Sequence, residues 1–453
     1  MPADPPAGVV RRGSQPRLVT RAVMLSLGAG VLSLSRFGYG LLLPGMRTDL
    51  GWSYIQAGVM NTALGIGYLA GTVAAVAVLP RAGERRAYLV AFTVVTLTLL
   101  ASGVTSEYPM LLALRAIGGA AGAVLFVAGA AFAAHLARAS RAPGLVLGAY
   151  FAGVGPGIVV SALLAPLVLS HPRGWQLGWL IMGAVALTYL PAVVRATRDL
   201  RAVAEPSVVA TGFSACRHAR TLRWVLAAFA LFGLGYVPYM SFIVAAYRGT
   251  GAGPLAITIF WAVLGLAATG SGWLWQPLIE RTHAGAPVAL LLAITALGAV
   301  LPVLAPNAVG MLASAVVFGA TFLAVITAVT QLIRAVLPEP AWTLGITLAT
   351  VLFGCGQAAS PALTGLLADA TATLDSALIT AAATLAAGAA LASRQRGVGD
   401  TLPHRPSDHP PAGACYGKVT QVAGRAFNPV APAGHNSSGR TRAGSRRCGL
   451  PRQ

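Results

Sequence analysis

Charged residues are scarce in this sequence. Of its 453 residues, 10% are Asp, Glu, Lys or Arg, whereas 56% are hydrophobic. A soluble domain has about 25% charged residues, so this chain has too few of them to cover a surface that faces water. The composition therefore argues against a soluble enzyme and indicates a protein whose surface lies largely in lipid.

Lysine and cysteine are also rare. Lys418 is the single lysine and Val419 follows it, so the chain lacks the Gly-Lys-Ser/Thr ending of a P-loop. The four cysteines form no Cys-x-x-Cys pair, and their spacing gives neither a zinc site nor a disulfide framework. We expect no ATPase activity, no metal and no cofactor.

Long apolar stretches are abundant. A helix needs about 20 mostly apolar residues to cross a bilayer, and the alternating pattern of membrane barrel strands is absent. The first stretch is longer than a signal-peptide core and no small-residue cleavage site follows it, so we expect it to be retained. The stretches predict an all-α membrane protein of twelve transmembrane helices in two sets of six, at about 22–44, 54–79, 87–105, 109–134, 144–169, 176–194, 223–247, 255–279, 286–305, 308–333, 341–367 and 374–393.

Arginines are distributed unequally between the two sides of this topology. With the N-terminus inside, the outer connections hold only Arg47, Arg173 and Arg248. Inner segments of membrane proteins carry an excess of Lys and Arg, so we predict a multi-pass protein of the inner or plasma membrane with both termini in the cytoplasm. The net charge of +20 then follows from topology, and we expect no nucleic-acid partner. The arginines expected on the cytoplasmic side, not counting those of the tail, are Arg11, Arg12, Arg17, Arg21, Arg81, Arg85, Arg86, Arg138, Arg141, Arg195, Arg198, Arg201, Arg217, Arg220, Arg223, Arg281 and Arg334.

Polar segments predict the boundaries of the domains. The longest internal break is basic and separates two halves of similar length, and the final segment is rich in Pro, Gly, Ser and Arg. Such a segment cannot bury enough apolar surface to fold alone. We expect a cytoplasmic N-terminus at 1–21, helical bundles at 22–194 and 223–395, a cytoplasmic linker at 195–222, and a disordered basic tail at 396–453.

The two halves contain an internal repeat. Gly38-Tyr39 in the first predicted helix aligns with Gly235-Tyr236 in the seventh, and the loops at 79–86 and 278–285 correspond as well. Two related bundles joined by a long inner loop suit alternating access, in which one half rocks against the other around a central site.

Several segments resemble the major facilitator superfamily over about residues 20–395. The loop at 76–86 (VAVLPRAGERR) is similar to the signature Gly-x-x-x-Asp-Arg-x-Gly-Arg-Arg, with Val76 and Pro80 replacing its Gly and Asp. More narrowly, RFGYGLLLPGM at 36–46, GYLAG at 67–71 and FGLGYVPYMSFIVA at 232–245 resemble the YbfB/YjiJ-type branch. The resemblance implies a membrane transporter, and it leaves the cargo open.

The same resemblance implies a gate at the inner ends of the helices. Its residues would come from the signature loop and from its second copy, which keeps an acid–arginine pair. They are Arg81, Gly83, Arg85, Arg86, Glu280 and Arg281.

Two arginines, Arg36 and Arg115, fall inside predicted helices. Ions within a membrane are costly and usually face a cavity where they serve function; the structural alternative is that each arginine reaches the interface or bonds helix-end carbonyls. Acids and histidines all lie outside the predicted spans or at their ends, so these arginines have no evident counterion. The pattern favours an organic anion as substrate, with Asp49 as the candidate for a proton carrier.

Uncharged polar and aromatic side chains within the spans complete the candidate substrate site. Each of them either touches substrate or bonds neighbouring helices to one another, which is equally effective in satisfying a buried polar group. They are Tyr39, Asn61, Tyr68, Tyr236, Tyr239, Gln331 and Gln357.

Together these patterns predict a secondary transporter that moves a small molecule, an organic anion being one candidate, by alternating access. We expect a monomer in the lipid bilayer, with or without a coupling proton. Proton-driven efflux of drugs or metabolites and a membrane sensor that moves nothing are the alternatives. A membrane enzyme is disfavoured because the spans contain no Ser-His, His-Glu or paired carboxylate set.

Overall fold

A computed structural model describes residues 15–198, 200, 221–281, 284–338 and 341–395. The regular structure of these residues is helical throughout. Most of the predicted N-terminal segment and linker, and all of the tail at 396–453, lie outside the described residues.

In the first half, four of the six predicted spans lie wholly within single helices. Helix α1 begins at Gln15 rather than near residue 22, so it extends the first span at its N-terminal end. The bounds are α1 (Gln15–Leu50), α2 (Tyr54–Ala82), α3 (Glu84–Ser102), α4 (Tyr108–Arg138), α5 (Pro143–Phe151), α6 (Val154–Ala162), α7 (Ala165–Ser170) and α8 (Gly174–Ala196).

The second half consists of six long helices. They are α10 (Arg223–Gly249), α11 (Pro254–Arg281), α12 (Ala286–Leu304), α13 (Ala308–Val336), α14 (Trp342–Thr371) and α15 (Asp375–Ala392). With α5 and α6 taken as one segment, twelve helical segments of the described chain are long and apolar enough to cross a membrane, as the sequence predicts.

The fifth predicted span is interrupted twice, and prolines explain both breaks. A proline inside a helix lacks an N–H and its ring collides with the carbonyl four residues earlier. Pro156 disrupts the chain at Ala152, where α5 ends, and Pro166 disrupts it at Ala162, where α6 ends. The sequence therefore crosses here as short helical pieces rather than as one straight helix.

Two large apolar clusters form the core. One is built mainly by α1–α8 and the other mainly by α10–α15. The repeated glycines take equivalent places in them, because a Cβ on Gly38 would meet Met182 of α8, and one on Gly235 would meet Leu385 of α15. In each half, the first helix thus packs closely on the last.

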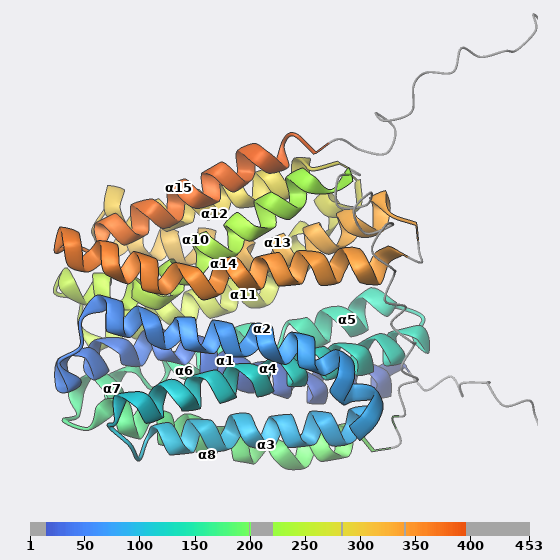
Figure 1. Cartoon of the computed structure of the whole chain (residues 1–453), viewed down its shortest axis with the longest axis horizontal. Coiled ribbons are helices and arrows are strands. Elements are labelled where there is room, and N and C mark those ends of the chain that lie inside the picture. Colours follow the sequence, from blue (N-terminus) through green and yellow to red (C-terminus); the bar gives the residue numbers. More distant parts are fainter. Residues whose placement is uncertain (1–14, 199, 201–220, 282–283, 339–340, 396–453) are drawn as a thin grey trace, which may run out of the picture. The chain divides into compact units, whose positions relative to one another are not determined.

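The halves meet mainly where α2 packs on α14, α6 on α11, and α1 on α10, and α7 also contacts α11. Figure 1 shows α2 running beside α14. Small residues permit the close approach, since a Cβ on Gly58 would lie 2.1 Å from the Pro361 carbonyl oxygen and one on Gly65 would lie 2.8 Å from Ala358 Cα.

Glycines also join helices within the first half. A Cβ on Gly67 or Gly71 of α2 would lie 2.0 Å and 2.2 Å from the carbonyl oxygens of Ala116 and Ala120 in α4. From the α4 side the matching residue is Gly119, where a Cβ would lie 2.2 Å from the Leu64 carbonyl oxygen. The small-residue pattern of α2 therefore brings two backbones into contact, as such patterns do in membranes.

We expect Gly67→Ala to destabilise the protein because the added methyl group would collide with backbone, which cannot rotate away. Overpacking of this kind costs about 1–3 kcal/mol, so the midpoint of thermal unfolding in detergent should fall by several degrees. Gly270→Ala is the matched control, because a Cβ there has no atom within 4 Å. Equal midpoints for the two variants would contradict the packing role.

Candidate functional site

Arg36 of α1 meets residues of the other half near the middle of the helices. Its Nη2 donates to Gln357 Oε1 of α14, and this oxygen also accepts from the Tyr236 hydroxyl of α10 at 3.1 Å. The Arg36 guanidinium also interacts with the Tyr236 hydroxyl, and Gln357 Nε2 is buried without a partner. The cluster therefore retains unused donors.

Three aromatic rings surround the Arg36 guanidinium. Its Cζ lies 5.9 Å from the ring centre of Phe37, 5.3 Å from that of Tyr68 and 5.7 Å from that of Tyr236. We call these three residues the aromatic collar. Ring faces attract cations at such distances, so the collar helps to solvate a charge that has no acidic neighbour in the described part of the site.

A small pocket opens against this cluster. The gaps between its side chains total about 320 Å³, and little of that space is wide enough for a water molecule. A substrate would therefore have to widen it. The lining residues are Arg36, Phe37, Asn61, Leu64, Gly65, Tyr236, Val237, Met240, Ser241 and Gln357.

Arg115 of α4 is placed differently. It is 4% exposed, and it donates from Nη1 to the Ser35 carbonyl at 2.6 Å and from Nη2 to Asn61 Oδ1 at 2.5 Å. Its Cζ also lies 4.6 Å from the ring centre of Tyr39 and 5.7 Å from that of Trp179. Arg115 does not line the pocket; Nη1 and Nη2 each have an acceptor, and its Nε is buried without a partner.

Asn61 connects Arg115 to the other half of the protein. Its Oδ1 accepts from Arg115, and its Nδ2 donates to Ser241 Oγ of α10 at 2.6 Å. Ser241 in turn donates to the Val237 carbonyl. A buried arginine thus orients an amide that both lines the pocket and crosses the interface between the halves.

The remaining tyrosines of the predicted set point elsewhere. Tyr39 donates to the Ala57 carbonyl at 2.8 Å, and Tyr239 bonds Ser314 Oγ at 2.6 Å while its ring stacks on Phe318 at 3.8 Å. Neither lines the pocket. Tyr68 reaches the site only through its ring, as part of the collar.

Gln331 lies away from the pocket. It is exposed and lines a separate hollow of about 410 Å³ among the ends of α11, α12, α13 and α14, together with Glu280 and Arg334. The sequence could not reveal this difference, because it does not show how far apart Gln331 on α13 and Gln357 on α14 lie along the direction of the helices.

The predicted gating residues lie at exposed helix ends. Gly83 has a φ of 77° between α2 and α3, Arg81 donates to the Ala77 carbonyl, and Glu280 accepts from Gln276. In the described part of the chain, the remaining members make no hydrogen bond or ion pair; they are Arg85, Arg86 and Arg281. Their part in gating stays a prediction.

Two acids lie at the opposite end of the helices. Asp49, the predicted proton carrier, is exposed at the end of α1 and accepts from Trp175 Nε1 at 2.9 Å, away from the pocket. Asp369 of α14 accepts from the backbone N–H groups of Tyr54 and Ile55 at 2.9 Å and 2.8 Å. This carboxylate caps α2 across the interface between the halves, where the positive end of the helix dipole favours an anion.

Sequence reasoning missed Ser241 and Asp369. A single serine in an apolar helix and an acid in the last turn of a helix are common, so neither stands out before the helices are assembled. Among the described residues, no group of three His, Cys, Asp or Glu side chains could hold a metal ion.

A buried cationic pocket between two sets of membrane-length helices defines a membrane transport protein. The chain belongs to the family described as the uncharacterised MFS-type transporter YbfB, whose model matches residues 25–393. It is thus a multi-pass membrane protein and a transporter rather than an enzyme, and the resemblance read from its sequence is confirmed. No curated protein sequence matches the chain.

Solved structures share the fold. A bacterial homologue of the human lysosomal transporter Spinster, inward-facing and unoccupied, superposes with a TM-score of 0.64 at 18% identity, covering 84% of this chain and 98% of that one. The nucleoside transporter NupG gives a TM-score of 0.61 at 12% identity, covering 83% of this chain and 98% of that one. These likenesses confirm the predicted major facilitator fold.

We expect Arg115→Gln to destabilise the folded protein more than Arg36→Gln does. Loss of Arg115 leaves Asn61 Oδ1 without its donor, at a cost of about 1–3 kcal/mol for an unsatisfied buried group. It also removes the bond to the Ser35 carbonyl, which still accepts within helix α1. Loss of Arg36 leaves Gln357 still bonded to Tyr236. Thermal unfolding of both purified variants in detergent tests this, and a larger loss for Arg36→Gln would contradict the assignment.

Proposed function

We propose that this protein is a secondary transporter that carries a small organic anion across the cytoplasmic membrane by alternating access, with both termini in the cytoplasm. The observation that carries the proposal is Arg36, a cation with unused donors in a pocket whose described lining contains no acid. A carboxylate would meet the guanidinium through charge-assisted hydrogen bonds.

The position of the pocket supports alternating access. Arg36, Phe37, Asn61 and Leu64 come from the first half, and Tyr236, Ser241 and Gln357 come from the second. A ligand bound between the halves touches both, so its binding can bias how they sit against each other. Many transporters hold substrate in this way at the interface of their repeats.

Flux into vesicles tests the proposal. We expect purified protein in proteoliposomes to give saturable uptake of at least one of radiolabelled acetate, benzoate and succinate, measured with and without an imposed pH gradient. Arg36→Gln should lower that uptake about tenfold or more, because a charged hydrogen bond contributes about 1.5–3 kcal/mol.

Arg248→Gln is the matched control, since Arg248 is exposed at the end of α10 and lies outside the pocket. Its uptake should equal that of the wild type. Uptake that survives Arg36→Gln undiminished would contradict an anionic cargo, and a response to the pH gradient would show coupling to protons.

Asp369 supplies a second test, because alternating access requires its contact to break when the halves part at this end. Positive-inside orientation assigns that end to the outer side. Loss of a charged helix cap costs about 0.5–2 kcal/mol, so Asp369→Asn should favour the outward-open arrangement by roughly two- to thirtyfold.

Spin labels on Val104 and Val309 would report the change. Both positions are 77% exposed and lie next to the outer helix ends of opposite halves. Pulsed electron resonance should show a larger fraction of long distances in Asp369→Asn than in the wild type. Asp375→Asn, which alters an acid in the first turn of α15, is the control; unchanged distances in Asp369→Asn would contradict the outer contact.

A further inference from the structure

The central pocket offers one cation. Arg36 is the only charged residue in its described lining, whereas Arg115 lies outside the lining and donates to the Ser35 carbonyl and Asn61. A ligand with two or more negative charges would leave at least one of them without a partner in a region of low dielectric, which is costly. The charge of the site therefore matches a single negative charge.

The free donors of the site suit a carboxylate. Arg36 contributes the guanidinium N–H groups that it does not use on Gln357, and Gln357 contributes Nε2, which is buried without a partner. These donors come from opposite halves and belong to side chains that already touch. Two oxygens in one plane can accept from both, and a guanidinium binds that geometry bidentately.

The rest of the lining is mostly apolar and aromatic, with Phe37, Leu64, Val237 and Met240 bordering the pocket. Asn61 adds an amide whose groups are taken by Arg115 and Ser241. Among the described residues, the hydroxyls in the lining belong to Ser241 and Tyr236. Ser241 already donates to Val237, and Tyr236 donates to Gln357. A sugar-like body would find too few partners for its hydroxyl groups, and each unpaired one would carry a desolvation penalty.

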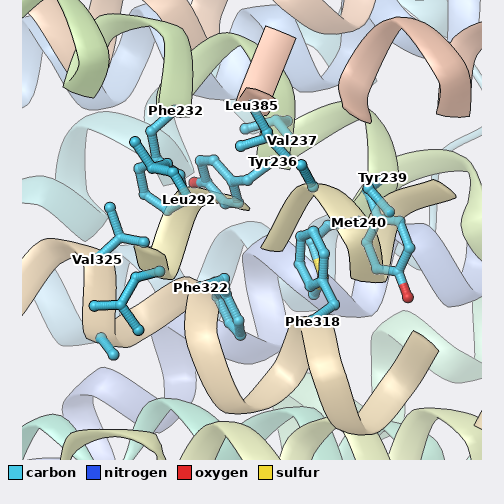
Figure 2. Close-up of a cluster of buried hydrophobic side chains, with 14 of the residues drawn as sticks. Phe232, Tyr236, Val237, Tyr239, Met240, Leu292, Phe318, Phe322, Val325 and Leu385 are labelled. Carbon is cyan, nitrogen blue, oxygen red and sulfur yellow. The ribbon is translucent and has the colours of Figure 1, made fainter. Parts of the chain in front are cut away.

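The Tyr236 ring is held by other rings. It lies nearly parallel to Phe232, Phe353 and Phe322, with ring centres 5.0 Å, 5.6 Å and 6.3 Å away. Figure 2 shows Tyr236 beside Phe232, with Phe322 on the facing helix. Tyr236 thereby has a fixed position next to the cation. The residue is 3% exposed, so an aromatic body would stack on its ring as the pocket widens.

We propose that the ligand of this pocket is an aromatic monocarboxylate, whose carboxylate takes the donors of Arg36 and Gln357 and whose ring packs among Phe37, Tyr236 and the apolar lining. This substrate class rests on the proposed function for its place in a transport cycle. The binding site itself is independent of transport, so binding and flux can be tested separately.

Binding of radiolabelled benzoate to the purified full chain in detergent is the test. We expect saturable binding that unlabelled benzoate displaces. Cyclohexanecarboxylate, which lacks the aromatic ring, phthalate, which carries a second charge, and benzamide, which carries none, should each displace it about tenfold less effectively or worse.

Two substitutions of Tyr236 separate the ring from the hydroxyl. Tyr236→Phe keeps the ring and should hold benzoate within about threefold of the wild type, whereas Tyr236→Leu should weaken it about tenfold. Arg36→Gln should abolish measurable binding. Phe151→Leu, at a half-exposed aromatic outside the pocket, is the matched control and should bind as the wild type does.

Phthalate or benzamide that displaces benzoate as well as benzoate itself would overturn the assignment, as would folded protein that binds no benzoate. Wild-type affinity in Tyr236→Leu would contradict the claim that the ligand is aromatic. Benzoate that binds as expected while no anion enters vesicles would leave this site standing and overturn transport instead. Flux of another class of solute, with no binding of benzoate, would leave transport standing and overturn the benzoate site.

Discussion

Everything in this site depends on keeping two guanidinium groups charged inside a membrane protein whose described central residues include no acid. Arg115 is solvated by a backbone carbonyl, an amide and two aromatic faces. These partners are neutral, so they satisfy hydrogen bonds without cancelling the charge. The helices must therefore approach closely enough to supply such groups, and the glycines of α2 and α4 permit that approach.

The two arginines have different roles. Arg115 donates to the Ser35 carbonyl and fixes Asn61 at the interface between the halves, whereas Arg36 keeps donors directed at the pocket. Sequence alone treated them alike, because both are single cations within apolar spans. The difference arises from the neighbours: α4 carries Arg115 against the core of its own half, and α1 carries Arg36 to the boundary with α10 and α14.

Twelve spans and the fold could be predicted because hydropathy and helix length are local properties, and bilayer thickness sets their scale. The breaks of the fifth span follow from Pro156 and Pro166, which are equally local. The site, by contrast, is formed by residues that are far apart in the sequence. Arg36 and Gln357 are 321 residues apart along the chain, so polar residues could be proposed one by one, but nothing in their spacing separated Gln357 from Gln331 or Tyr236 from Tyr239.

The contacts that join the halves at the centre engage the same group that the proposed ligand would bind, the Arg36 guanidinium. Gln357 Oε1 accepts from Arg36 where, in the proposed cycle, a carboxylate oxygen would, and the aromatic collar covers the cation further. A bound carboxylate would therefore replace the Gln357 oxygen as the acceptor of the Arg36 guanidinium. The cation then has a hydrogen-bond acceptor both with and without the ligand.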